Sequence, residues 1–240
     1  MQYRKIGRTG LKVSAMAMGT GFFGSLTNEA DATKIMDLAF EKGITLFDTS
    51  NSYAGGHSEQ IVGKFIKNKR QAVVLATKVA LKQGPGPNDL GLSRKHILRA
   101  VEDSLKRLDS DYIDIYYAHT PDYTTPIEET LRAFDTLIKE EKIRYIACAN
   151  FHAWQLLKAL WVSDRNNLAR FDCIQVPYNL LTRDIEYELL PCCANEGVGV
   201  TVFNPLAAGL LTGKHDPNKA PAPNTRKNWT GRSRALLVPR

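Results

Sequence analysis

Four side chains that handle protons stand at the ends of three short apolar runs, or just beyond them. They are Asp48, Tyr53, Lys78 and His119. The runs cover 44–48, 73–77 and 113–118, and their β-branched and aromatic residues predict buried strands. In a parallel α/β barrel the carboxyl ends of all strands open on one face, which carries the chemistry. We therefore expect the four side chains to converge on one pocket.

This set of side chains suits proton transfer to a carbonyl oxygen. A phenol has an unperturbed pKa near ~10, and a neighbouring ammonium favours the phenolate, so Lys78 is expected to lower the pKa of Tyr53. Tyr53 would then be the general acid, with Asp48 holding Lys78 in place. His119 would hydrogen-bond the substrate carbonyl and orient it. Each residue alone has a structural interpretation, such as a solvated lysine or a capping aspartate. Their shared position at three consecutive strand ends favours catalysis.

The elements that would position these residues alternate along the chain. Strands are predicted over 15–19, 44–48, 73–77, 113–118, 143–149, 173–176 and 198–203. Helices are predicted near 28–42, 58–69, 93–107, 126–141, 153–162 and 183–196. Strands separated by helices imply βαβ units and a parallel sheet, and thus an α/β fold of the TIM (β/α)8-barrel type. A length of 240 residues fits one such domain spanning 1–240, with a hairpin in 1–14.

Local signals mark the starts of two of these helices. Ser93 is expected to cap the helix near 93–107. Thr125, followed by a proline and then a glutamate, predicts a capping box for the helix near 126–141. Both signals place a helix start after a predicted strand, in agreement with the alternation.

The predicted strands number seven, one fewer than a closed (β/α)8 barrel needs. After 203 the sequence continues with a loop and a polar, basic tail, so the last strand and its flanking helices are expected to be lacking. The first and seventh strands would then keep unpaired edges. The tail 227–240 does not fit the pattern, and its last residues, 237–240, resemble the front half of a thrombin cleavage site.

Composition argues against several classes of protein. The net charge is +7, but the positive residues are spread along the chain without a nucleic-acid motif, so no nucleic-acid partner is expected. No apolar run reaches the ~18 residues of a membrane span, and the N-terminus lacks the apolar core of a signal peptide. A cytoplasmic protein is therefore expected. The four cysteines lack metal-ligand spacing, so we expect no metal site and buried free thiols at Cys148 and Cys173.

The sequence resembles the aldo-keto reductases, and the matching motifs run through most of the chain. They are YRKIGRTGLKVSAMAMGT, LFDTSNSYAGGHSE, LATKV, GLSRKHI, SLKRLDSDYIDIYYAHTPD, TPIEETLRAFDTL, KIRYIACANF, IQVPYNLL and VFNPLAAGLLTGK. The resemblance implies that the family's Asp–Tyr–Lys–His tetrad falls on Asp48, Tyr53, Lys78 and His119. It also implies that NADPH, or less often NADH, binds extended across the barrel mouth.

The resemblance further implies which residues hold this cofactor. Asn150 and Gln175 would bind the nicotinamide carboxamide, with Ala149 where the family has a serine. Phe203 would stack on the nicotinamide, since only an aromatic ring is needed there. Further contacts with the cofactor would come from Gly19, Thr20 and Asp48. The phosphates would be bound by Asn204, Pro205, Leu206, Ala207, Gly209, Leu211, Lys214 and Arg226.

The leading hypothesis is an NADP(H)-dependent oxidoreductase that reduces aldehydes or ketones to alcohols, with Tyr53 as the general acid. Its partner would be a small carbonyl compound, whose identity the sequence leaves open, together with the oligomeric state. Two alternatives stay open. One is a cofactor-binding regulatory module similar to the potassium-channel β subunits, a branch of the family with asparagine in place of His119. The other is a truncated reductase that has lost activity with its last strand.

Overall fold

Seven strands form one parallel sheet in sequence order. The structure, a computed structural model, describes residues 1–214. The sheet order is β3-β4-β5-β6-β7-β8-β9, and among the described residues β3 and β9 form its two edges. The strands are β3 (Ala17–Gly19), β4 (Leu46–Asp48), β5 (Val74–Val79), β6 (Ile113–Ala118), β7 (Ile143–Ala149), β8 (Cys173–Pro177) and β9 (Gly199–Phe203).

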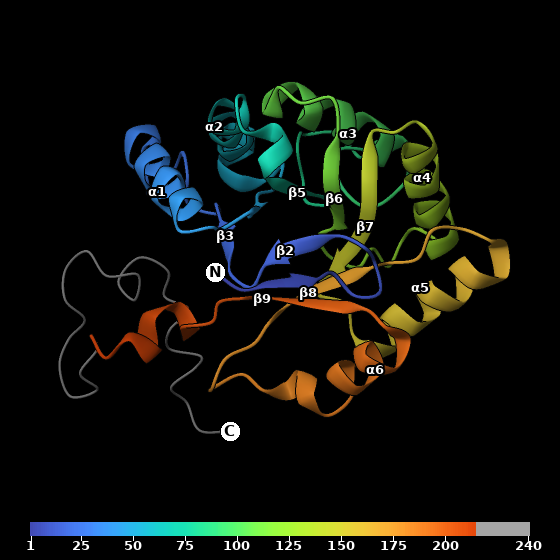
Figure 1. Cartoon of the computed structure of the whole chain (residues 1–240). Helices are drawn as coiled ribbons and strands as arrows, with labels where there is room; N and C mark the ends of the chain where they lie inside the picture. Colours follow the sequence, from blue (N-terminus) through green and yellow to red (C-terminus); the bar gives the residue numbers. More distant parts are fainter. Residues whose placement is uncertain (215–240) are drawn as a thin grey trace.

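Within residues 1–214, six helices cover the outside of the sheet, which curls into an incomplete barrel (Figure 1). They are α1 (Glu29–Glu41), α2 (His57–Ile66), α3 (Arg94–Leu108), α4 (Ile127–Lys139), α5 (Ala153–Asn166) and α6 (Leu189–Glu196). Each helix lies between two consecutive strands of the sheet, which confirms the predicted α/β fold of the TIM (β/α)8-barrel type. None of these helices combines the length and the apolarity that crossing a membrane requires.

Alternation along the strands separates two apolar cores. Side chains such as Phe47 and Leu75 point outward and pack in the larger cluster, between the sheet and the helices. Their neighbours along the strands fill the barrel interior: Leu46, Val74, Ala76, Ile115, Tyr117, Ala147, Ala149 and Cys173. Because the side-chain period of a strand is two, the next inward positions are Asp48, Lys78 and, just beyond β6, His119. The same pattern that builds the apolar interior therefore ends in polar groups at the carboxyl end.

An N-terminal hairpin closes the other end of the barrel. Its strands, β1 (Tyr3–Lys5) and β2 (Lys12–Ser14), pair antiparallel. Ile6 and Val13 belong to the same cluster as the inward side chains of the strands. Gly7, in the turn, lies against the residue that precedes β8 and the first residue of β9. The hairpin therefore covers the barrel interior at the amino ends of the strands.

One predicted helix cap is confirmed and the other is wrong. The hydroxyl of Ser93 accepts the N–H of His96 at 3.3 Å and caps α3. Thr125 caps nothing, because its hydroxyl donates to the Asp122 carboxylate at 2.8 Å instead. The helix α4 begins after Pro126 without a side-chain cap.

The helix predicted near 183–196 is broken into two parts. A short 3-10 turn, Asp184–Glu186, comes first, and α6 starts only at Leu189. The Glu186 carboxylate accepts hydrogen bonds from Arg183 at 2.7 Å and from Tyr178 at 2.6 Å. These bonds hold the turn to the end of β8 rather than to the helix.

We expect Gly7→Ala to destabilise the fold. Gly7 has φ +48°, and a Cβ there would lie 2.6 Å from the Asp172 carbonyl oxygen and 2.8 Å from the Gly199 amide nitrogen. Left-handed strain and a backbone clash together should lower the free energy of unfolding by about 1–3 kcal/mol, measured by urea denaturation. The control is Gly10→Ala, where a Cβ meets nothing within 4 Å. Equal effects of both substitutions would contradict the packing of the hairpin turn.

Candidate active site

The structure brings the four proton-handling side chains together at the carboxyl ends of β4, β5 and β6. Lys78 is fully buried, and its Nζ forms an ion pair with Oδ1 of Asp48 and donates to the Thr49 carbonyl oxygen at 2.8 Å. The same nitrogen lies 5.3 Å from the centre of the Tyr53 ring. The rings of Tyr53 and His119 meet edge to face, with their centroids 5.9 Å apart and an interplanar angle of 82°. Their catalytic roles stay a prediction.

A tight turn returns Tyr53 over the strand ends. The Tyr53 N–H donates to the Ser50 carbonyl oxygen at 3.1 Å. The next three residues have left-handed backbones, with φ 49° at Ala54, 64° at Gly55 and 93° at Gly56. Glycine adopts such angles without strain, so the sequence YAGG can reverse direction before α2 begins. The phenol thus points back toward Lys78 rather than into solvent.

The pKa of Tyr53 is raised, contrary to the expectation from the sequence. Burial is the largest cause, because it disfavours the phenolate. The positive charge of Lys78 acts in the opposite direction, as does its hydrogen bond to the phenol, while the negative charge of Asp48 raises the pKa further. Desolvation therefore outweighs the ammonium. At neutral pH the phenol keeps its proton and is in the form that a proton donor needs.

His119 is a neutral imidazole at physiological pH. Its pKa is lowered to about 3, chiefly by burial and then by the positive charge of Lys78. A neutral imidazole carries one N–H and one lone pair, and which nitrogen holds the proton depends on its partners. The hydroxyl oxygen of Ser50 lies 3.1 Å from Nδ1.

Asp48 and His119 also orient the two predicted carboxamide ligands. The Gln175 side-chain nitrogen donates to Oδ2 of Asp48 at 2.9 Å, and that of Asn150 donates to the His119 carbonyl oxygen at 2.9 Å. Both acceptors can only accept, so the amide nitrogens must face them. Oε1 of Gln175 and Oδ1 of Asn150 accept no bond from the described residues. Two amide oxygens are thus left as free acceptors near the tetrad.

The other predicted cofactor residues are spread around the barrel mouth. Thr20 is buried and its hydroxyl donates to the Asp48 carbonyl oxygen at 3.0 Å, whereas Gly19 is exposed. Phe203 ends the edge strand β9 and is 39% exposed. The structure extends as far as the exposed Lys214, and Arg226 and 227–240 lie outside the described residues.

The loop after β9 is held by its own hydrogen bonds. This segment contains six of the residues predicted to bind the cofactor phosphates: Asn204, Pro205, Leu206, Ala207, Gly209 and Leu211. Oδ1 of Asn204 accepts the N–H of Ala208 at 2.6 Å. The N–H groups of Ala207, Gly209 and Leu211 donate to carbonyl oxygens inside the loop. In this conformation those four amides are engaged, so phosphate contacts through them would require the loop to rearrange.

Ser50 is the site residue that the sequence reasoning missed. It lies two positions beyond Asp48, so the period of two that places Asp48 inward carries on past the end of β4. The hydroxyl faces His119, which is 69 positions away in the chain. The alternation of side chains could have indicated that Ser50 points inward. Its partner, His119, follows the distant strand β6 and could not be read from local sequence.

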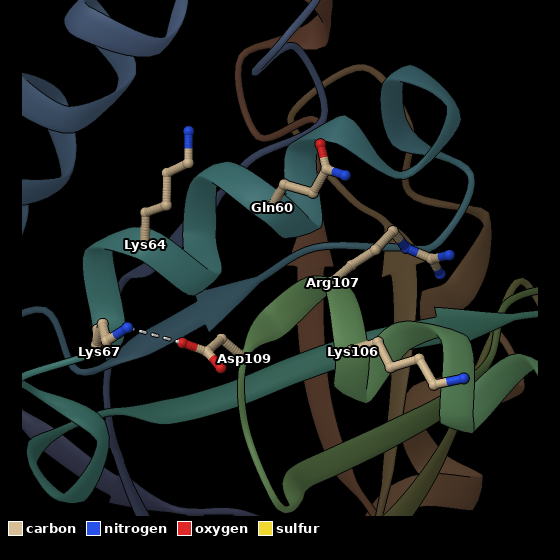
Figure 2. A pocket seen from close by; sticks show the side chains of 6 residues that line it. All are labelled: Gln60, Lys64, Lys67, Lys106, Arg107 and Asp109. Atoms are coloured by element: carbon tan, nitrogen blue, oxygen red, sulfur yellow. Dashed lines mark ion pairs between the residues drawn. The ribbon is translucent and has the colours of Figure 1, made fainter.

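One hollow of the described residues lies away from this site. It measures about 600 Å³ on the outer face between α2 and α3, and Figure 2 shows its lining of Gln60, Lys64, Lys67, Lys106, Arg107 and Asp109. Lys67 pairs with Asp109 at 3.2 Å, Lys64 with Glu29 and Arg107 with Glu59. The ammonium groups of Lys64 and Lys106 point apart (Figure 2). Paired and divergent cations do not form an anion site.

A second hollow lies among the loops beyond the carboxyl ends of the strands. It measures about 580 Å³ between the loops that follow β5 and β6. Its lining includes Ala80, Lys82 and Thr120, of which Thr120 directly follows His119. None of the four proton-handling side chains lines this hollow, which therefore lies beside the tetrad loops rather than at the tetrad itself.

Comparisons with known proteins identify relatives of this chain. The model of the aldo/keto reductase family matches residues 15–236. The chain is 42% identical over 225 residues to the uncharacterized oxidoreductase YrpG of Bacillus subtilis (strain 168), covering 89% of this chain and 69% of YrpG. It is 40% identical over 227 residues to a probable voltage-gated potassium channel subunit beta of Arabidopsis thaliana, covering 92% and 69%. A putative subunit of the same name in Schizosaccharomyces pombe is 40% identical over 221 residues, with 89% and 64% covered.

We expect His119→Asn to flatten the dependence of stability on acid. The folded pKa of about 3 lies below the unfolded value of ~6.5, so the unfolded chain binds more protons between these values. The free energy of unfolding should therefore fall as the pH drops from ~6.5 toward 3. The stability contributed by the neutral imidazole is fully present above pH ~6.5. Asparagine does not titrate, so the variant should lose less stability between pH ~7 and ~4.5 in urea denaturation.

The matched control for this experiment is His57→Asn, because His57 is exposed. That variant should keep the wild-type loss of stability over the same pH range. A wild-type slope in His119→Asn would show that the imidazole is not kept neutral by its surroundings.

Proposed function

Because the chain belongs to the aldo/keto reductase family, we propose that it reduces an aldehyde or ketone to an alcohol with NADPH, or NADH, as cofactor. The observation that carries the proposal is the buried Lys78–Asp48 pair, which lies beside Tyr53 and opposite His119. The substrate is a small carbonyl compound that enters at the barrel mouth. Cytoplasmic location stays a prediction from the sequence.

The proposed mechanism divides the work between two neutral groups. A nicotinamide held by Asn150 and Gln175 would supply a hydride to the carbonyl carbon. His119 donates a hydrogen bond to the carbonyl oxygen and holds the carbonyl in position. Tyr53 gives its phenolic proton to the same oxygen as negative charge develops there. Lys78 then stabilises the phenolate that Tyr53 becomes, because its ammonium lies within reach of the ring and keeps Asp48 as its counter-ion.

The amide oxygens at the mouth fit a primary carboxamide. Its NH₂ group has two hydrogens to donate, and Gln175 and Asn150 present two acceptors whose nitrogens are already committed. The half-exposed ring of Phe203 offers a surface for stacking on a nicotinamide. Ala149 supplies no hydroxyl, so the carboxamide oxygen has one donor fewer than in the family pattern. The phosphate contacts assigned to the loop after β9 and to Lys214 stay predictions.

A second candidate is a cofactor-binding regulatory module. Two of the relatives described above are named as channel β subunits, and each is 40% identical to this chain. The tetrad geometry favours the reductase, because His119 lies where that branch has asparagine. A third candidate is a member of the family without reductase activity. Turnover separates the first candidate from both others, and cofactor binding separates the second from the third.

Tyr53→Phe should abolish carbonyl reduction. The substitution removes the only group assigned to donate the proton and keeps the ring, so turnover should fall by about 10²–10⁴-fold with cofactor affinity nearly unchanged. The measurement is NADPH oxidation with a panel of small aldehydes and ketones. Tyr187→Phe, at a side chain that is 86% exposed, should behave as wild type. Retained turnover in the Tyr53 variant would remove the role proposed for the phenol.

Gln175→Met should weaken cofactor binding without preventing it. Methionine keeps the length of the side chain but offers no amide acceptor, so NADPH affinity should fall by roughly 5- to 30-fold. A titration of protein fluorescence with NADPH measures it, with the exposed Gln83→Met as the control. If wild type shows no quenching up to millimolar NADPH, both cofactor-binding candidates fail and the inactive reductase remains.

A further inference from the structure

A chain of two serines leads from the loop after β4 to the imidazole of His119. Ser50 is fully buried, and its hydroxyl oxygen lies 3.1 Å from Nδ1 of His119. The same oxygen accepts the backbone N–H of Ser52 at 3.3 Å and lies 2.9 Å from the Ser52 hydroxyl. Among the described residues, the Ser50 hydroxyl has these three contacts, and it is closed off from solvent.

Counting protons leaves two arrangements for this chain. The Ser50 oxygen has two lone pairs and one hydrogen, and the N–H of Ser52 takes one lone pair. In the first arrangement the Ser52 hydroxyl donates to the other lone pair, and Ser50 donates its hydrogen to Nδ1. In the second, Nδ1–H of His119 donates to Ser50, and Ser50 donates to Ser52. His119 is neutral, so it carries one proton in either case.

The two arrangements give the imidazole opposite functions at Nε2. When Ser50 donates to Nδ1, the single proton sits on Nε2, which can donate to a carbonyl oxygen. When Nδ1 holds the proton, Nε2 has only a lone pair and repels that oxygen. In a neutral imidazole the hydrogen bond of one nitrogen decides the state of the other. Only the first arrangement is compatible with carbonyl reduction.

We propose that Ser50 is a positioning residue that donates its hydroxyl hydrogen to Nδ1 of His119 and so keeps the proton on Nε2, with Ser52 holding the Ser50 hydroxyl in that direction. This inference rests on the proposed function. It assigns Ser50 no contact with the substrate, since its hydroxyl acts through the imidazole. Because the hydroxyl is buried, water does not replace it when it is removed, and the ring loses both its partner and its orientation.

Ser50→Ala tests the proposal. The turnover number for carbonyl reduction should fall by about 10-fold, as expected for the loss of one buried hydrogen bond that matters in the transition state, while NADPH affinity stays unchanged. Ser163→Ala is the matched control. Ser163 is also fully buried in α5, and its hydroxyl donates one bond, to the Ala169 carbonyl oxygen at 2.8 Å. That variant loses a comparable bond away from the site and should keep wild-type turnover.

A readout independent of turnover is the tautomer of His119, observed by nitrogen NMR of ¹⁵N-histidine-labelled protein near neutral pH. His119→Asn assigns the signals by removing them. Wild type and Ser163→Ala should show the proton on Nε2, and Ser50→Ala should show a mixture or the Nδ1 form. Ser50→Cys, which keeps the size with a weaker donor, should lie between them.

Three results would overturn the proposal. The first is an Nδ1–H imidazole in wild type, which needs no variant to be seen. The second is an unchanged tautomer in Ser50→Ala, and the third is a turnover in Ser50→Ala equal to that of Ser163→Ala. If wild type reduces no carbonyl compound, the proposed function fails, and the wild-type tautomer still decides the assignment of Ser50.

Discussion

The buried ion pair between Lys78 and Asp48 is the interaction on which the rest of the site depends. An ammonium without solvent costs several kcal/mol unless a carboxylate and further acceptors replace its water. Lys78 has both, from Asp48 and the Thr49 carbonyl oxygen, and the second oxygen of Asp48 accepts from Gln175. Removing either Lys78 or Asp48 leaves the other charge in the interior without compensation. The ion pair and the Gln175 bond to Asp48 therefore fix the positions of β4, β5 and β8 relative to one another.

The same ammonium acts on the pKa of both of its aromatic neighbours, although burial is the larger cause at each. Its charge adds to burial at His119 and lowers the pKa of the imidazole, whereas at Tyr53 it opposes burial. Both rings are therefore uncharged near neutral pH, one as a phenol and one as an imidazole. Two uncharged rings beside one compensated charge suit an uncharged ligand better than an ion.

Local periodicity accounts for what the sequence predicts correctly. The period of two along 44–48, 73–77 and 113–118 places Asp48, Lys78 and His119 on the inner side, and the structure has them there. The expectations that failed depend on competition between distant groups. The pKa of Tyr53 rises because burial outweighs a neighbouring charge, and burial arises from the whole assembly. The Thr125 hydroxyl donates to Asp122 and accepts no N–H of its own helix, and sequence spacing does not rank these two partners.

The hydrogen bond from Gln175 to Asp48 joins residues 127 positions apart. Closing so long a loop costs entropy that is recovered only when the intervening strands have already paired, and contacts of this range slow folding. The second oxygen of the Asp48 carboxylate therefore accepts its hydrogen bond from Gln175 only after β8 has paired with β7. A chain that has paired its strands only as far as β7 therefore lacks the Gln175–Asp48 bond, and the candidate site is complete only when β8 has joined the sheet.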